Sequence, residues 1–137
     1  MNSTNTPKVT SLDHLVITVA SIEATIAFYT RVLGMEAVQF GNGRQALAFG
    51  NQKINIHRHG AEFDPKALRP TPGSADLCFL TEAPLDHFIG HLEACQVPIE
   101  VGPVTRTGAR GPIQSVYLRD PDGNLIEVAN ELRSRFG

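Results

Sequence analysis

Metal-capable side chains occupy matching positions in two similar stretches of the chain. The first stretch places His14 at the start of an alternating apolar segment, and the second places Asp76 at the same point. A later apolar segment carries Asn55 in the first half and Glu127 in the second. Imidazole nitrogens and carboxylate oxygens are common ligands of divalent metals in proteins. The doubled pattern therefore suggests one mixed nitrogen and oxygen site built from both halves.

Such a site has a definite chemistry. Neutral imidazole and carboxylate suit Mn²⁺, Fe²⁺, Ni²⁺ or Zn²⁺, and three protein ligands leave positions open for two neighbouring substrate oxygens. A dication would act as a Lewis acid, and Glu127 or Asp76 would serve as a general base. His57, two residues after Asn55, is a further candidate ligand. With His14 it would complete the set of two histidines and one carboxylate found in non-haem iron oxygenases.

Strand periodicity predicts that these side chains share the less apolar faces. Leu15, Ile17 and Val19 alternate with polar positions, and His14 lies on the opposite side from them. A period of two is expected of a half-buried strand. The same separation holds in the strands that carry the other candidate ligands, so we expect all of them on the faces that the core leaves open.

Each half also contains one helix and a short run of strands. Ser21 is a suitable N-cap for the first helix and Gly34 a suitable stop, while the second helix begins near Pro84 and ends before Pro98. We predict an α+β fold of two βαβββ modules in tandem that form a cupped mixed sheet. The expected boundaries are a disordered lead-in over residues 1–10 and a single domain over residues 11–132, with module 1 at about 11–60, a linker at about 61–73 and module 2 at about 74–131.

Two segments interrupt the periodic pattern. Residues 59–74 contain three prolines and are expected to be the linker between the modules. Residues 102–112 are expected to form a mobile loop, because glycines at several positions permit movement. Arg106 and Arg110 in this loop are candidates to meet an anionic group of a substrate, and the alternative is that both are solvated surface arginines.

Composition excludes several classes of partner. The chain has 137 residues, 42% hydrophobic content and a net charge of −2, which is enough for one packed domain and provides no basic field for nucleic acid. No apolar run approaches the roughly 18 residues that span a bilayer. The first residues lack the apolar stretch of a signal peptide, and Cys78 and Cys95 lack the spacing of a metal finger or redox pair. We therefore expect a cytoplasmic protein.

These motifs resemble the vicinal oxygen chelate superfamily, which contains glyoxalase I, extradiol dioxygenases, fosfomycin-resistance thiol transferases and bleomycin-binding proteins. The resemblance covers about residues 11–131. Segments 49–57 and 106–113 look most like a glyoxalase-domain-containing subgroup. The most specific segments are 12–19 with 28–29 and 33–35, and 118–128.

The resemblance implies a metal held in a cup between paired modules, with ligands on the first and last strand of each. Carried over by position, His14 and Glu127 match metal ligands of the family, and Asp76 stands where many members have histidine. Asn55 stands where glyoxalase I has glutamate, and its amide is a weaker ligand. The third ligand is therefore open between Asp76 and His57, and the metal among Ni, Zn, Mn and Fe.

The family suggests three functions. The preferred one is a metal-dependent lyase or isomerase that chelates two adjacent oxygens of a small substrate and stabilises an oxyanion or enediolate. The alternatives are an Fe(II) extradiol dioxygenase and a non-catalytic protein that binds and sequesters a drug or metabolite. Small members of the family usually pair, so we expect a homodimer. The ligands of one cup then come from one subunit or from two, which the sequence leaves open.

Overall fold

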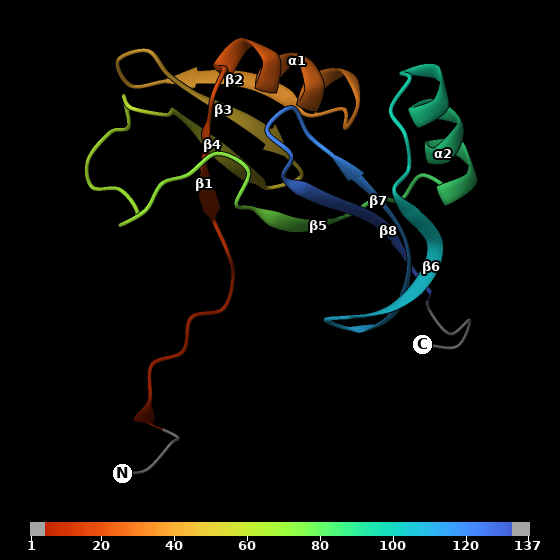
Figure 1. Cartoon of the computed structure of the whole chain (residues 1–137). Coiled ribbons are helices and arrows are strands. Elements are labelled where there is room, and N and C mark those ends of the chain that lie inside the picture. The colour runs from red at the N-terminus through yellow and green to blue at the C-terminus, as the bar shows by residue number, and fades with distance from the viewer. Residues whose placement is uncertain (1–4, 133–137) are drawn as a thin grey trace.

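The structure is a computed structural model that describes residues 5–132 (Figure 1). Residues 1–4 of the expected lead-in lie outside the described residues, and residues 5–13 form an exposed segment that leads away from the body. The first module contains β1 (His14–Val19), α1 (Ile22–Arg31), β2 (Glu36–Phe40), β3 (Arg44–Phe49) and β4 (Gln52–Arg58). The second contains β5 (Asp76–Leu80), α2 (Leu85–Ala94), β6 (Val101–Gly108), β7 (Gly111–Arg119) and β8 (Leu125–Glu131).

Each module forms its own four-stranded mixed sheet. Sheet A has the strand order β1-β4-β3-β2, and sheet B has the order β5-β8-β7-β6. In both sheets the first strand pairs in parallel with the last strand of the module, and the other pairs are antiparallel. The predicted α+β class with two tandem βαβββ modules is confirmed.

One hydrophobic core joins the two modules. Ile17 of β1 and Ile126 of β8 are buried in the same cluster of apolar side chains. The rings of Phe49 and Phe79, one from each module, meet edge to face with centroids 5.3 Å apart. The predicted alternation in β1 is confirmed, since its apolar side faces this core while His14 is exposed. The faces that carry the candidate ligands are thus directed away from the core.

Local signals in the sequence explain the helices. The hydroxyl oxygen of Ser21 accepts a hydrogen bond from the backbone N–H of Ala24 at 3.1 Å, as the predicted N-cap requires. Gly34 follows α1 with a φ of +69°, a conformation that glycine adopts without strain. Within residues 5–132 no helix is long and apolar enough to cross a membrane.

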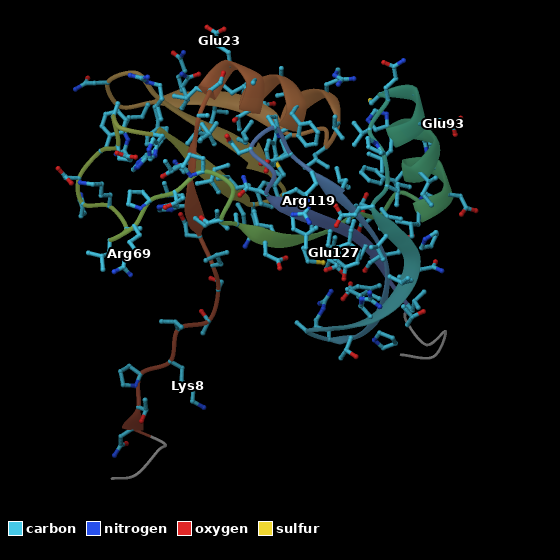
Figure 2. The ribbon with its side chains drawn as sticks, in the orientation of Figure 1. Lys8, Glu23, Arg69, Glu93, Arg119 and Glu127 are labelled. Atoms are coloured by element: carbon cyan, nitrogen blue, oxygen red, sulfur yellow. The ribbon has the colours of Figure 1, made fainter. Side chains whose placement is uncertain are left out.

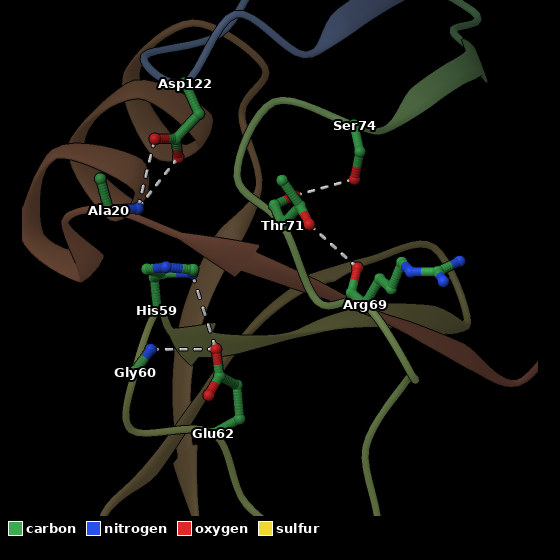
Figure 3. Close-up of polar contacts among 8 residues, drawn as sticks. All are labelled: Ala20, His59, Gly60, Glu62, Arg69, Thr71, Ser74 and Asp122. Carbon is green, nitrogen blue, oxygen red and sulfur yellow. Dashed lines mark hydrogen bonds and ion pairs between the residues drawn. The ribbon is translucent and has the colours of Figure 1, made fainter.

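The turn between β7 and β8 fastens the second module to α1. The hydroxyl of Tyr29 donates to Asp120 Oδ2 at 2.7 Å, and the backbone N–H groups of Asp122 and Asn124 donate to Asp120 Oδ1 at 2.9 Å each. The backbone N–H of Ala20, which precedes α1, donates to the Asp122 carboxylate at 3.2 Å (Figure 3). We call this set of contacts the clasp. It fixes the position of one module relative to the other.

The prediction of a mobile loop over residues 102–112 was wrong. Strands β6 and β7 form a hairpin there, with Gly108 paired to Gly111 across a two-residue turn. Pro103 lies in β6, the edge strand of sheet B, where a missing N–H removes no inner ladder bond. The prolines and glycines therefore concealed a strand pair instead of indicating a loop.

Candidate functional site

The predicted carboxylates share one face of sheet B. Pairing of β5 with β8 sets Cys78 opposite Glu127 and Asp76 opposite Leu125, so these side chains project to the same side. Figure 2 shows Glu127 on the side of sheet B away from α1. Burial, followed by the charge of Glu127 and a hydrogen bond to it, raises the pKa of the Cys78 thiol to about 11. At neutral pH the thiol is therefore protonated and donates toward Glu127.

A cavity of about 450 Å³ opens on this face and brings in a residue that the sequence analysis missed. Tyr117 lies opposite Glu127 in the pairing of β7 with β8 and lines the cavity. Arg106 Nε donates to the Tyr117 hydroxyl at 3.0 Å, and the guanidinium lies 5.5 Å from the centre of the ring. Tyr117 projects to the same face as Glu127, and only the register between β7 and β8 reveals this.

The two predicted arginines have different surroundings. Both line the cavity. Arg110, at the tip of the hairpin, makes a two-pronged contact with Glu131, with Nη2 2.7 Å from Oε1 and Nε 3.0 Å from Oε2. Its guanidinium is therefore engaged by a carboxylate of the same chain. Arg106 donates to the Tyr117 hydroxyl and to the Thr105 carbonyl, and it forms no salt bridge with an acidic residue of the described chain.

His14 stands at the exposed start of β1 in sheet A. Its Nδ1 lies 2.9 Å from Asp13 Oδ2, and no described residue contacts its Nε2. Contact of one ring nitrogen with a carboxylate orients many metal-binding imidazoles and leaves the other nitrogen for the metal. The surroundings of His14 thus suit a ligand that binds through Nε2.

His57 lies deeper on the same face of sheet A and is only 3% exposed. Arg44 Nη2 approaches its Nε2 to 3.5 Å, and the ring of Phe63 meets the imidazole edge to face at 5.5 Å. Burial, and after it the charge of Arg44, lower the pKa of His57. The imidazole is therefore neutral, and a cation already stands beside the nitrogen that faces Arg44.

The single chain divides the candidate ligands between two sheets. His14 and His57 belong to sheet A, and Asp76 and Glu127 belong to sheet B. Among residues 5–132 there is no group of three or more His, Cys, Asp or Glu side chains that could hold a metal ion. The chemistry of the donors fits a divalent metal, but one chain gathers only part of the set.

Comparisons with known proteins place this geometry in context. The family model described as Glyoxalase/Bleomycin resistance protein/Dioxygenase superfamily matches residues 11–128. Virulence protein STM3117 of Salmonella typhimurium is 56% identical over 118 residues, which are 86% of this chain and 82% of that protein. Glyoxalase domain-containing protein RDO1 of Mycosarcoma maydis is 57% identical over 122 residues, which are 89% of this chain and 69% of that protein. Neither name states a reaction.

Solved structures show the same fold. An integron cassette protein from the mobile metagenome of V. cholerae is 58% identical, with a TM-score of 0.90 over 91% of this chain and 98% of that one. Lactoylglutathione lyase from Agrobacterium tumefaciens is 24% identical, with a TM-score of 0.68 over 90% of this chain and 95% of that one. At that identity the likeness to the lyase concerns the fold alone.

Proposed function

The chain belongs to the Glyoxalase/Bleomycin resistance protein/Dioxygenase superfamily, and from this premise we propose that it is a metal-dependent lyase or isomerase of the glyoxalase type. It would hold two adjacent oxygens of a small substrate and stabilise an oxyanion or enediolate. One observation carries the proposal. His14 presents an uncontacted Nε2, and Asp76 and Glu127 project from a face that the core leaves open. In the described part of the chain, neither Asp76 nor Glu127 forms a salt bridge.

A second copy of the chain would complete the set. Val16 beside His14 on sheet A is 44% exposed, and Leu80 on the ligand face of sheet B is 54% exposed, so both faces carry uncovered apolar surface. The face of sheet A also carries Arg44 and Lys53 with Glu36, and that of sheet B carries Asp76 and Glu127 with Arg106 and Arg119. Both faces carry charges of both signs that could pair across an interface, and their uncovered apolar side chains favour contact between sheet A of one copy and sheet B of the other. We therefore propose a homodimer with two cups.

The residues of each cup would have different roles in the reaction. Glu127 would act as general base and accept a proton from the carbon that bears one substrate oxygen and neighbours the carbonyl carbon that bears the other. Tyr117, oriented by Arg106, would donate a hydrogen bond to a substrate oxygen. A divalent metal, held by His14, Asp76 and Glu127, would supply Lewis-acid stabilisation of the negative charge on those oxygens. Cys78, protonated beside Glu127, would keep that carboxylate in place.

Asp76 is the better third ligand of the two candidates. The Arg44 guanidinium, which carries a permanent charge, lies 3.5 Å from His57 Nε2 and would repel a dication there. Asp76 lies one row from Glu127 on the same face of sheet B, and the cation that interacts with it, Arg119, is already paired with Glu100. A carboxylate is also a suitable ligand for a hard divalent ion.

A binding protein is the second candidate. The observation that favours it is the cavity of about 450 Å³ on sheet B. An antibiotic binding protein, TnmS3 from Streptomyces, shares the fold with 19% identity and a TM-score of 0.70, over 91% of this chain and 98% of that one. Such a protein would hold its ligand in this cavity without turnover.

Metal analysis with matched variants tests the proposal. Purified protein should carry about one metal ion per chain, and His14→Ala and Glu127→Ala should each lower the metal affinity by about tenfold or more. His87→Ala and Glu82→Ala, which alter exposed residues outside the proposed site, serve as controls and should retain the metal. Wild-type protein that binds no Ni, Zn, Mn or Fe would leave the binding-protein alternative. Iron together with oxygen consumption on catechols would indicate a dioxygenase.

A further inference from the structure

A second cavity, of about 320 Å³, lies between sheet A and the segment that joins the modules. Val16, Thr18 and His57 contribute to it from sheet A, and residues 65–67 and 69–71 line it from the joining segment. The proposed reaction does not use this cavity. Because the pairing of β1 with β4 places Thr18 beside His57, the cavity lies on the same side of sheet A as His14.

The joining segment is shaped by its own hydrogen bonds (Figure 3). The hydroxyl of Ser74 donates to the backbone carbonyl of Thr71 at 2.8 Å, and the hydroxyl of Thr71 donates to the carbonyl of Arg69 at 3.1 Å. Phe63, earlier in the segment, packs on His57. The wall of the cavity is therefore formed before any ligand arrives, which reduces the entropy lost on binding.

The charge of the lining favours an anion. Lys66 and Arg69 line the cavity, and the lining contains no aspartate or glutamate. Lys66 Nζ lies 2.9 Å from Asp64 Oδ1, so it already has an ionic partner. The guanidinium of Arg69 makes no hydrogen bond or ion pair with any residue in the described range. An oxyanion would give Arg69 the two-pronged partner that a guanidinium prefers.

The tautomer of His57 also favours an anion in this cavity. A guanidinium can only donate, so the 3.5 Å contact with Arg44 Nη2 requires His57 Nε2 to act as acceptor. The proton of the neutral ring then lies on Nδ1, which is a donor. Arg44 itself is held between Phe40 and Phe63, with its guanidinium carbon 5.1 and 4.7 Å from the ring centres. His57 is thus fixed as a hydrogen-bond donor.

One buried acceptor nearby lacks a partner. Asn55 is 5% exposed, and its Oδ1 makes no hydrogen bond in the described structure. Its neighbour across the strand pair is Val16, which lines the cavity. A buried polar atom without a partner is unfavourable by about 1–3 kcal/mol. Asn55 does not itself line the cavity, so a ligand hydroxyl would satisfy this oxygen by reaching it past Val16.

We propose that this cavity binds the oxyanion of a small substrate, a carboxylate or a phosphate, at Arg69 and the N–H of His57, with a ligand hydroxyl donating to Asn55. The inference rests on the proposed function for the reaction at the other end of the ligand. Thr18 is four residues from His14, roughly 13 Å along β1 at about 3.3 Å per residue. The anionic group is therefore separate from the two reacting oxygens, and the substrate class is a hydroxylated organic acid or phosphate ester.

Titration of metal-free protein with acetate and with inorganic phosphate tests the site alone. We expect saturable changes in the NMR signals of the backbone amides of residues 66–69 and 71 and of the His57 ring nitrogens, with the tighter probe identifying the oxyanion. The His57 nitrogen shifts should also report a neutral ring protonated on Nδ1. Absence of saturable change with either anion up to about 50 mM would overturn the proposal.

Matched arginine variants make the test specific. Arg69→Gln should weaken anion binding about tenfold, the loss of one charge-assisted two-pronged contact. Arg58→Gln alters an exposed arginine at the end of β4 whose side chain alternates away from His57, and it should leave binding unchanged. Equal weakening by both variants would show a general effect of charge and refute the site. Circular dichroism of each variant confirms folding.

Metal analysis separates this inference from the proposed function. Anion binding at Arg69 in a protein that takes up no metal would retain the cavity and reject the metal-dependent enzyme. Metal uptake without anion binding would do the reverse. Arg44→Gln adds an internal check, because it should change the His57 nitrogen shifts toward a mixture of tautomers.

Discussion

Replacing Tyr29 by phenylalanine should loosen the clasp between the modules. Tyr29 is fully buried, and its hydroxyl donates at 2.7 Å to Asp120, whose side chain is also buried and accepts further bonds from Asp122 and Asn124. A hydrogen bond to a charged group contributes about 1.5–3 kcal/mol. The substitution removes one such bond and leaves the carboxylate with its other donors. We therefore expect a loss of about 2 kcal/mol in the free energy of unfolding.

Urea and thermal unfolding at one fixed protein concentration measure this loss. With an unfolding entropy of about 2.1 cal/mol/K per residue and 137 residues, a loss of about 2 kcal/mol corresponds to about 7 °C in Tm. Tyr117→Phe is the matched control. Among the described residues the Tyr117 hydroxyl contacts only the exposed Arg106, so the stability of this variant should stay within about 0.5 kcal/mol of wild type.

The pH dependence gives an independent signature. Burial, and after it the hydrogen bond and charge of Asp120, raise the pKa of Tyr29 above its ordinary value. A raised pKa in the folded state means that the contribution is complete below about pH 10 and is lost as the pH rises further. The difference between wild type and Tyr29→Phe should shrink above about pH 10. A variant as stable as wild type at pH 7, with an unchanged alkaline slope, would refute the clasp.

Two further predictions concern glycines and surface charge. Gly73→Ala should destabilise the protein by more than about 1 kcal/mol, because Gly73 has a φ of +82° and an added Cβ would lie 2.6 Å from the Asp122 carbonyl oxygen. Gly90→Ala, inside α2 with open space around it, is the control and should be neutral or stabilising by up to about 1 kcal/mol. Equal urea midpoints for the two variants would contradict this prediction. Arg110→Ala removes an exposed pair with Glu131, so its urea midpoint should match that of wild type, and a large loss would show that the hairpin tip is structurally essential.

Strand periodicity predicted the parts of the fold that depend on local pattern. Alternation in β1 and β8 correctly placed His14 and Glu127 on faces away from the core, because burial of one face imposes a period of two. The hairpin of β6 and β7 was missed because Pro103 and several glycines mask that period in an edge strand.

Contacts between distant residues could not be predicted from local pattern. Nothing near His57 in the sequence reveals that Arg44 approaches its Nε2 or that Phe63 covers it. The clasp joins Tyr29 to Asp120, residues 91 positions apart. Such pairs follow from how the modules pack, and they decide which nitrogen is available and which carboxylate is buried.

The central claim is that His14 of one subunit and Glu127 of another share one metal site. Heterodimers of His14→Ala with Glu127→Ala, each chain bearing a different affinity tag, can be purified over both tags and analysed for metal. One cup of each heterodimer then holds both intact residues, so we expect about one metal ion per dimer, against about two in wild type and none in either variant homodimer. Heterodimers without metal, alongside a metal-loaded wild type, would contradict the shared site.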